Sequence, residues 1–266
     1  MYPSASGTVP ALRGIDAQFP RGTVTVIVGP SGAGKSTLLR LLACLERPMA
    51  GEILIGGQPT AHLSSRARRR FAAERIGYVF QEPQRNLLDY LTVTEHLALA
   101  TRMRQIAGHR PPDAELARDE VDRMGLTSVA AARAADLSAG EQQRLAFAMA
   151  VAGGPDLVIG DEPTAELDPD DTAHLVSLLP VMAAQGRTFV LTSHDRALVD
   201  AADRVLMVRN GCLTGRSDRG GELLAVVDDV GRIQLPPAAL ADFADGTARV
   251  IVDGDGPDRT IRIERP

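Results

Sequence analysis

Cysteine, lysine and long apolar runs are scarce in this chain of 266 residues. Its two cysteines, Cys44 and Cys212, stand far apart and lack the spacing of a metal site, and Cys44 is expected to be a core thiol. No apolar run reaches the roughly 18–20 residues that cross a bilayer, and no segment resembles a signal peptide. These absences predict a cytoplasmic protein, so any membrane-spanning part of its activity belongs to another chain.

The charge balance is mildly acidic, with a formal net charge of -5. It argues against a general binder of nucleic acid or of anionic membranes. The densest basic cluster covers residues 66–70, which read Arg-Ala-Arg-Arg-Arg, and we interpret it as the solvated face of a helix. With 44% hydrophobic residues, the chain has ample core for one large domain and a small appendage.

Lys35 is the only lysine, and every other strongly basic side chain is arginine. A bias that spares one position indicates that arginine cannot replace lysine there. Residues 29–37 read Gly-Pro-Ser-Gly-Ala-Gly-Lys-Ser-Thr, which contains the Gly-x-x-x-x-Gly-Lys-Ser pattern of a phosphate-binding P-loop. The β-branched residues 23–28 predict the buried strand that must precede such a loop. The residues predicted to bind nucleotide here are Gly29, Ser31, Gly32, Ala33, Gly34, Lys35, Ser36 and Thr37.

Each residue type in this loop has a physical role at the phosphates. Glycines let successive N–H groups turn inward, where a β-carbon would crowd the anion or strain the backbone by about 1–2 kcal/mol. Lys35 supplies a compact charge that reaches the β- and γ-phosphates, whereas a guanidinium is too bulky. Ser36 places a hydroxyl on Mg²⁺, and a helix from Thr37 to about Leu45 points its positive end at the same site.

Strand-like and helix-like stretches alternate from residue 24 to about residue 210, which predicts an α/β fold with a mostly parallel sheet. Residues 82–150 are rich in helix-forming side chains and predict a helical subdomain. The pair Asn210-Gly211 predicts the tight turn of a terminal hairpin. A short strand closed by a turn is expected at residues 51–57, and further strands are expected at residues 75–81, 156–162, 188–194 and 205–211.

Two carboxylates, Asp161 and Glu162, follow the apolar stretch of residues 157–160. Ligands of open α/β sheets bind at the carboxyl ends of the strands, so both side chains are expected near the P-loop. Hydrolysis of a nucleoside triphosphate needs a carboxylate that holds Mg²⁺ and a group that activates water. We assign Asp161 to Mg²⁺, held through its hydration shell, and Glu162 as the general base, a role worth about 10²–10⁴-fold in rate.

Residues 137–144, Leu-Ser-Ala-Gly-Glu-Gln-Gln-Arg, carry the most specific signal. At this point the chain resembles the ATP-binding-cassette (ABC) ATPases, whose signature reads Leu-Ser-Gly-Gly-Gln/Glu. In that family the signature serine and second glycine lie at a helix N-terminus and grip the γ-phosphate held by the opposite subunit. The resemblance therefore implies ATP contacts from Ser138, Gly140 and Glu141. The residues suit this role, because Ser138 can cap a helix and Glu141 can complete a capping box.

The other family elements follow in order, and the resemblance covers about residues 2–212. Gln81 matches the glutamine that senses Mg²⁺ and faces the membrane partner. Residues 165–168, Ala-Glu-Leu-Asp, match the D-loop, which ends at Asp168. His194 matches the switch histidine that contacts the γ-phosphate. Tyr2 lies where the family often places an aromatic ring that stacks on adenine, an interaction worth roughly 1 kcal/mol.

Within the family, residues 78–81, 86–93 and 140–144 resemble the lipoprotein-release and macrolide-export type. Members pair with a separate permease chain and, as homodimers, form two ATP sites that are each built from both subunits. The resemblance thus implies ATP and Mg²⁺ as cofactors, ATP hydrolysis coupled to transport, and a transmembrane permease as partner. It also implies a peripheral position at the inner face of the cell membrane. Direct binding to nucleic acid is not expected.

Three features depart from the family pattern. Ala139 replaces the first signature glycine, which is a mild change if only its N–H matters. The chain begins where a first strand would already have passed, so we expect that an edge strand is missing or that the true start lies upstream. The third departure is a small β-rich C-terminal extension, expected at residues 221–266. It follows a P-loop ABC ATPase domain with a RecA-like core, expected at residues 1–215 and including the helical subdomain.

The extension contains the stretch Asp229–Pro236, which resembles the core of swapped-hairpin domains of the AbrB type; a generic β-hairpin is the alternative. Such domains dimerise, and some bind DNA. Residues 221–266 carry nine acidic side chains against five arginines, the opposite of what phosphate binding needs. We therefore favour dimer support or regulation over DNA binding.

Two other functions stay open. A soluble ABC ATPase without a permease would act on nucleic acid or ribosomes. Such proteins usually carry two cassettes or long coiled-coil insertions, and the interval between Gln81 and Leu137 leaves no room for one. Alternatively, the cassette only senses ATP, and the extension makes the protein a DNA-binding regulator.

Overall fold

The structure, a computed structural model, describes residues 2–4, 7–9, 11–108, 120–219, 221, 224–226, 249–253 and 260–264. The chain forms two compact units, Met1–Leu224 and Ala225–Pro266. The first unit extends past the predicted boundary at residue 215, since strand β10 (Cys212–Asp218) runs across that position. Within the described residues, no helix is long and apolar enough to cross a membrane.

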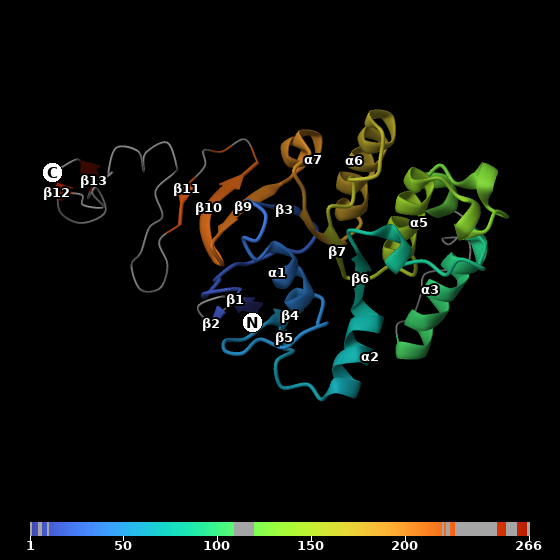
Figure 1. Ribbon diagram of the computed structural model, residues 1–266, viewed down its shortest axis with the longest axis horizontal. Coiled ribbons are helices and arrows are strands. Elements are labelled where there is room, and N and C mark those ends of the chain that lie inside the picture. The colour runs from blue at the N-terminus through green and yellow to red at the C-terminus, as the bar shows by residue number, and fades with distance from the viewer. Residues whose placement is uncertain are drawn as a thin grey trace. The chain divides into compact units, whose positions relative to one another are not determined.

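A seven-stranded sheet with the order β11-β10-β9-β3-β8-β7-β6 organises the fold (Figure 1). Neighbouring strands from β9 to β6 are parallel, whereas β10 is antiparallel to β9. This mostly parallel sheet confirms the predicted α/β class. Besides β10, its strands are β3 (Val24–Val28), β6 (Ile76–Val79), β7 (Leu157–Asp161), β8 (Thr188–Thr192), β9 (Arg204–Arg209) and β11 (Leu224–Ala225).

Helices cover both faces of this sheet, because successive residues of a strand point to opposite faces. In β8, Phe189 stacks on Phe147 of helix α5 with ring centroids 6.3 Å apart, whereas the next residue, Val190, joins Leu39 of α1 in the core on the other face. All four side chains are fully buried. The helices are α1 (Lys35–Leu42), α2 (Ser65–Arg75), α3 (Val93–Ala107), α5 (Ala139–Val151), α6 (Pro169–Ala184) and α7 (Arg196–Ala201).

Short elements complete the first unit. The short strand predicted within residues 51–57, closed by a turn, is β4 (Leu54–Ile55). Gly56 and Gly57 turn the chain with φ of 58° and 76°, and β5 (Gln58–Pro59) pairs with β4 to complete a hairpin. The short elements are β1 (Tyr2–Ser4), β2 (Gly7–Val9), β4 (Leu54–Ile55), β5 (Gln58–Pro59) and the 3₁₀ helices η1 (Pro83–Arg85), η2 (Thr127–Val129) and η3 (Ala134–Asp136).

The predicted Asn-Gly turn joins β9 to β10. Asn210 and Gly211 have φ of 50° and 78°, the positive values that a tight hairpin turn requires at both positions. A β-carbon at Gly211 would lie 2.6 Å from the carbonyl oxygen of Ala11, so only glycine fits. The N–H of Gly211 donates to the carbonyl oxygen of Ala33 at 2.9 Å, and the hairpin turn thereby supports the P-loop.

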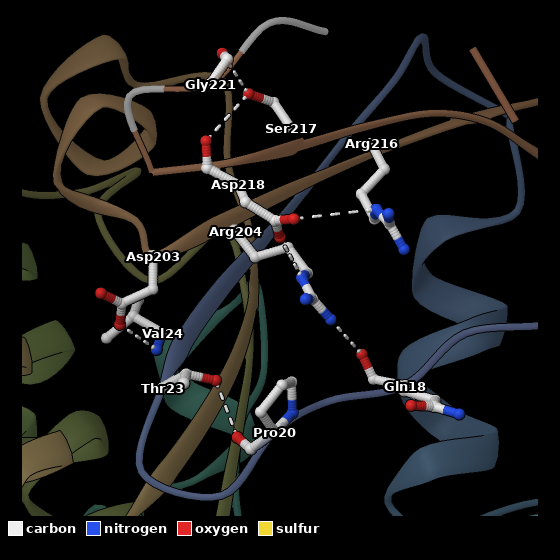
Figure 2. A network of polar contacts seen from close by, with 10 residues as sticks. All are labelled: Gln18, Pro20, Thr23, Val24, Asp203, Arg204, Arg216, Ser217, Asp218 and Gly221. Atoms are coloured by element: carbon white, nitrogen blue, oxygen red, sulfur yellow. Dashed lines mark hydrogen bonds and ion pairs between the residues drawn. The ribbon is translucent and has the colours of Figure 1, made fainter. Parts of the chain in front are cut away.

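Polar side chains tie the opposite end of this hairpin to the start of β3 (Figure 2). The Arg204 guanidinium donates to Asp218 Oδ1 at 2.7 Å and to the carbonyl oxygen of Gln18 at 2.9 Å. The carboxylate of Asp203 accepts the N–H of Val24 at 2.9 Å. These contacts lie at the amino ends of the parallel strands, and they leave the carboxyl ends to the functional site.

In the second unit, the described strands β12 (Arg249–Asp253) and β13 (Thr260–Glu264) form an antiparallel pair with Arg249 opposite Glu264. The stretch Asp229–Pro236, which carries the resemblance to AbrB-type domains, lies outside the described residues. That resemblance therefore stays a prediction.

Candidate nucleotide-binding site

One row of residues crosses four neighbouring strands at the carboxyl edge of the sheet. Ile27 pairs with Thr192, and Thr192 pairs in turn with Asp161. Val79 pairs with Gly160, one residue earlier in β7. Because these strands are parallel, the segments that follow them leave the sheet at the same edge. The structure thus gathers there the P-loop after β3, Gln81 after β6, Glu162 after β7 and His194 after β8.

The P-loop turns between β3 and α1 through three glycines with positive φ, which is 154° at Gly29, 75° at Gly32 and 103° at Gly34. A β-carbon at Gly29 would lie 2.0 Å from the carbonyl oxygen of Val208, and one at Gly34 would lie 2.7 Å from that of Ala11. At these two positions a β-carbon would therefore be crowded by the chain's own backbone, whereas the sequence analysis attributed the crowding to the bound anion. A β-carbon at Gly32 would meet no described atom within 4 Å.

Lys35 folds back over this loop. Its Nζ donates to the carbonyl oxygens of Gly29 at 2.6 Å and Pro30 at 3.3 Å, and the residue is 9% exposed. Helix α1 begins at Lys35, before the predicted start at Thr37. It ends at Leu42 and does not reach the predicted Leu45, because Cys44 takes a left-handed φ of 57° that a helix cannot continue through. The N-cap Gly34 has no side chain to cap the first turn, and phosphate oxygens are suited to that role.

Asp161 and Glu162 end β7 in different environments. Asp161 is 8% exposed, and its Oδ1 accepts a hydrogen bond from the hydroxyl of Thr192 at 2.7 Å. Glu162 has a left-handed φ of 51°, and its N–H donates to the oxygen of the same hydroxyl at 3.0 Å. One buried threonine therefore contacts both residues that the sequence assigned to metal binding and catalysis.

His194 contacts the Glu162 side chain twice. Its backbone N–H donates to Glu162 Oε2 at 3.2 Å, and its ring Nε2 lies 3.4 Å from Glu162 Oε1. The histidine side chain is 64% exposed, whereas that of Glu162 is 17% exposed. Gln81, two residues beyond the end of β6, is also exposed. These side chains can reach a ligand that approaches the edge of the sheet.

Ser138 and Glu141 form the predicted capping box at the start of α5. The Ser138 Oγ accepts the N–H of Glu141 at 3.3 Å, and Glu141 Oε2 accepts both the backbone N–H and the hydroxyl of Ser138 at 2.8 Å. The backbone hydrogen bond from Ser138, followed by that from its hydroxyl, lowers the pKa of Glu141 below its ordinary value. The box therefore fixes the serine at an exposed helix N-terminus.

The signature helix packs beside the segment that follows Glu162 in the same chain. Gln143 is fully buried, and its Nε2 donates to the carbonyl oxygen of Pro163 at 2.9 Å. A β-carbon at Gly140 would lie 3.5 Å from the carbonyl oxygen of Glu166. Asp168 is the N-cap of α6. The signature and the D-loop thus form one connected surface.

Residues 12–165, more than half of the chain, match the family model described as ABC transporter. The chain belongs to the ABC transporter family. Over 215 residues this ABC cassette is 38% identical to the lipoprotein-releasing system ATP-binding protein LolD 2 of Caulobacter vibrioides, a match that covers 80% of this chain and 92% of that protein.

A second relative of this ABC cassette is longer. The macrolide export ATP-binding/permease protein MacB 1 of Aeromonas hydrophila subsp. hydrophila is 35% identical over 232 residues. The match covers 86% of this chain but only 33% of that protein, so the chain spans about one third of the MacB 1 length.

Solved ABC cassettes share the fold. A dimeric structure of MJ0796, described as a bacterial ABC transporter cassette, has a TM-score of 0.73 and 28% sequence identity. The alignment covers 83% of this chain and 96% of that one. A dimeric post-hydrolysis state of MJ0796 bound to ADP and Pi gives the same TM-score at 27% identity. These likenesses confirm the P-loop ABC fold predicted from the signature.

Two site residues of the cassette differ in what the sequence predicted for them. Tyr2 lies in β1 opposite Val9, but its side chain is outside the described part of the structure, so its stacking on adenine stays a prediction. Thr192 was not singled out, although it is a polar residue inside a predicted strand that ends at His194. What would have identified Thr192 is its pairing with Asp161, and that pairing depends on the register between β7 and β8.

Proposed function

We propose that this ABC cassette binds and hydrolyses ATP as one half of a homodimer, and that ATP-driven closure of the dimer powers a separate transmembrane permease. The observation that carries the proposal is the row at the sheet edge, which places the P-loop, the Asp161-Glu162 pair and His194 beside one another. The dimeric MJ0796 structures and the relative LolD 2 support it. In this arrangement the protein lies at the inner face of the cell membrane, held by its permease.

The oxygen atoms at this edge suit Mg²⁺, a hard cation that keeps several waters and takes few protein ligands beside nucleotide phosphates. Among the described residues there is no group of three His, Cys, Asp or Glu that could hold a metal ion. We assign Ser36, Asp161 and Gln81 as the protein groups that hold it, directly or through water. Bound there, Mg²⁺ would neutralise charge on the β- and γ-phosphates while the γ-phosphoryl group is transferred to water.

The residues of the chain then divide the reaction between them. Lys35 exchanges its two carbonyl acceptors for oxygens of the β- and γ-phosphates, which the N–H groups of the P-loop also hold. Glu162 accepts a proton from the water that attacks the γ-phosphorus, and ATP and water give ADP and phosphate. His194, in contact with that carboxylate, lies where it can touch the γ-phosphate.

Dimer closure gives Ser138 a role at the nucleotide of the second copy. The capping box holds its hydroxyl and the first N–H groups of α5 at an exposed helix N-terminus, which favours an anion. In the proposed dimer this end of α5 faces the γ-phosphate bound by the P-loop of the second copy. Gln143 and Gly140 join that surface to the segment after Glu162, so closure and catalysis are connected.

Replacing Glu162 with glutamine tests this function. The variant should bind ATP and accumulate as a dimer, because the base is lost while the binding groups stay, and phosphate release should fall by about 10²–10⁴-fold. Size-exclusion chromatography with light scattering, with and without ATP, measures the dimer. Glu52→Gln, at an exposed carboxylate, controls for the lost charge. Wild-type turnover in Glu162→Gln would show that another group is the base.

The permease is tested separately by affinity purification from membranes solubilised in mild detergent. We expect recovery of a chain with several long apolar spans, identified by mass spectrometry, that raises or lowers the ATPase rate when reconstituted. Recovery of ribosomes or DNA without any membrane protein would support the soluble alternative.

A further inference from the structure

Thr192 occupies a position at the end of β8 that no motif identifies. The residue is fully buried, yet its hydroxyl lies between two functional groups. Its oxygen is 2.7 Å from Oδ1 of Asp161 and 3.0 Å from the backbone nitrogen of Glu162. The two contacts follow from the parallel register, which sets Asp161 directly beside Thr192.

The direction of both hydrogen bonds is determined by the atoms themselves. A backbone N–H can only donate, so the oxygen of Thr192 accepts from Glu162. The single hydroxyl proton of Thr192 then points at Oδ1 of Asp161, which accepts it. Oδ2 of Asp161 is left to face other ligands, and the carboxylate cannot rotate without breaking the hydrogen bond.

The contact to Glu162 has a second consequence. Glu162 is one of three described non-glycine residues with positive φ, a conformation that persists only where the surroundings impose it. The surroundings here are the hydroxyl of Thr192 on its N–H and the N–H of Ala165 on its carbonyl oxygen at 3.1 Å. The left-handed turn aims the Glu162 side chain at His194.

We propose that Thr192 is a positioning residue that sets the orientation of the Asp161 carboxylate toward Mg²⁺ and holds the backbone turn that aims Glu162 at the γ-phosphate. This inference rests on the proposed ATPase function and goes beyond it, because it assigns the geometry of both groups to one hydroxyl. Groups that orient the ligands of a metal typically change metal affinity or activity by about 10–100-fold when they are removed.

The test compares Thr192→Val, which keeps the shape and removes the hydroxyl, with Thr192→Ser, which keeps the hydroxyl. For Thr192→Val we expect kcat for ATP to fall about tenfold or more, and the Mg²⁺ concentration for half-maximal rate to rise by a similar factor. Thr192→Ser should restore most of both. The affinity for a fluorescent ATP analogue should be unchanged without Mg²⁺, and Mg²⁺ should strengthen it less than in the wild type.

Thr25→Val is the matched control. Thr25 lies in the adjacent strand β3, is fully buried, and its hydroxyl has no hydrogen-bond partner among the described residues. This variant should keep the wild-type kcat, Mg²⁺ dependence and melting temperature. A Thr192→Val protein that matches the wild type in kcat and Mg²⁺ dependence would overturn the proposal. So would equal loss of nucleotide affinity with and without Mg²⁺, since that result indicates a general structural role.

The binding measurement also separates this inference from the proposed function. It needs no turnover, so the effect of Thr192 on Mg²⁺-dependent affinity can be read even in a protein that does not hydrolyse ATP. A wild-type protein that binds the analogue without hydrolysing ATP would contradict the proposed function alone. An unchanged Mg²⁺ dependence in Thr192→Val, beside normal wild-type turnover, would contradict the role of Thr192 alone.

Discussion

The side chains of Glu162 and His194 meet at the edge of the sheet, with Nε2 of the histidine 3.4 Å from Oε1 of the glutamate. The backbone N–H of His194 also donates to the second carboxylate oxygen at 3.2 Å. The glutamate is thus held from the end of the neighbouring strand as well as from its own. Because these two residues, separated by 32 positions in the chain, are in direct contact, their effects on hydrolysis should be coupled.

The first prediction concerns the histidine ring. In His194→Ala the backbone hydrogen bond to Glu162 stays, whereas the contact from Nε2 is lost. We expect the ATPase rate to fall by about 10²-fold, the loss typical of one group that stabilises developing charge. The ring is 64% exposed, so the free energy of unfolding should change by no more than about 0.5 kcal/mol. Phosphate release and urea denaturation of the same sample measure the two effects, and a parallel loss of both would contradict the assigned role.

The second prediction concerns the single lysine. In Lys35→Arg the charge stays, but a planar guanidinium must fit where a compact ammonium lies 2.6 Å from the carbonyl oxygen of Gly29. We expect the Kd for ATP to rise by about 10- to 100-fold, the value of a lost hydrogen bond to a charged group. Titration with a fluorescent nucleotide measures it. Arg40→Lys, the reverse exchange at an exposed position of the same helix, should leave Kd unchanged. Wild-type affinity in Lys35→Arg would mean that the lysine has been kept for another reason.

The sequence predicts this site well where a single strand and its following turn carry the information. The P-loop, the Asp161-Glu162 pair and His194 each follow a β-branched or apolar run, and parallel strands must deliver such segments to one edge. The capping box of Ser138 and Glu141 is equally local, and the structure confirms it.

Features that depend on the pairing of distant segments could not be predicted. The role of Thr192 requires the register between β7 and β8, which residue types alone do not specify. Gly29 and Gly34 were explained by the phosphate, whereas their nearest obstacles are backbone atoms brought by the β9 strand and residue 11. Nothing in the sequence singles out Arg104, which is only 5% exposed because its hydrogen-bond acceptors come from α2, β6 and the C-terminal end of α5.

The third prediction concerns Arg104, which joins α3 to the sheet. Burial, and to a smaller extent the nearby Arg187, lowers the pKa of this guanidinium to about 10, so it stays protonated at pH 7. In Arg104→Met, the buried acceptors lose their donor, and the free energy of unfolding should fall by about 3 kcal/mol or more. Arg102→Met, at an exposed position of the same helix, should change it by no more than about 0.5 kcal/mol. Urea denaturation at pH 7 compares the two variants; equal stabilities would contradict the structural role. The acceptors are the carbonyl oxygens of Ala73, Ile76, Ala150 and Ala152.

The fourth prediction follows from the pKa of Glu141, which hydrogen bonds from the backbone and the hydroxyl of Ser138 hold below the ordinary value of 4.5. A carboxyl group with a lowered pKa in the folded state stabilises the fold fully above its unfolded pKa, and this contribution disappears as the pH falls through the folded value. Wild-type protein should therefore lose more stability between about pH 5 and pH 3 than Glu141→Gln, whose amide does not titrate. At pH 7 the variant should be the less stable of the two by about 1 kcal/mol at most, as for the loss of a partly exposed cap.

Melting temperatures of the wild type and Glu141→Gln at pH 7, 5, 4 and 3 test this prediction, with Glu166→Gln as a control for the lost charge. Parallel pH profiles of the wild type and Glu141→Gln would show that the capping carboxylate does not contribute to the fold, and the exposed helix end proposed to meet the second copy would then need another support.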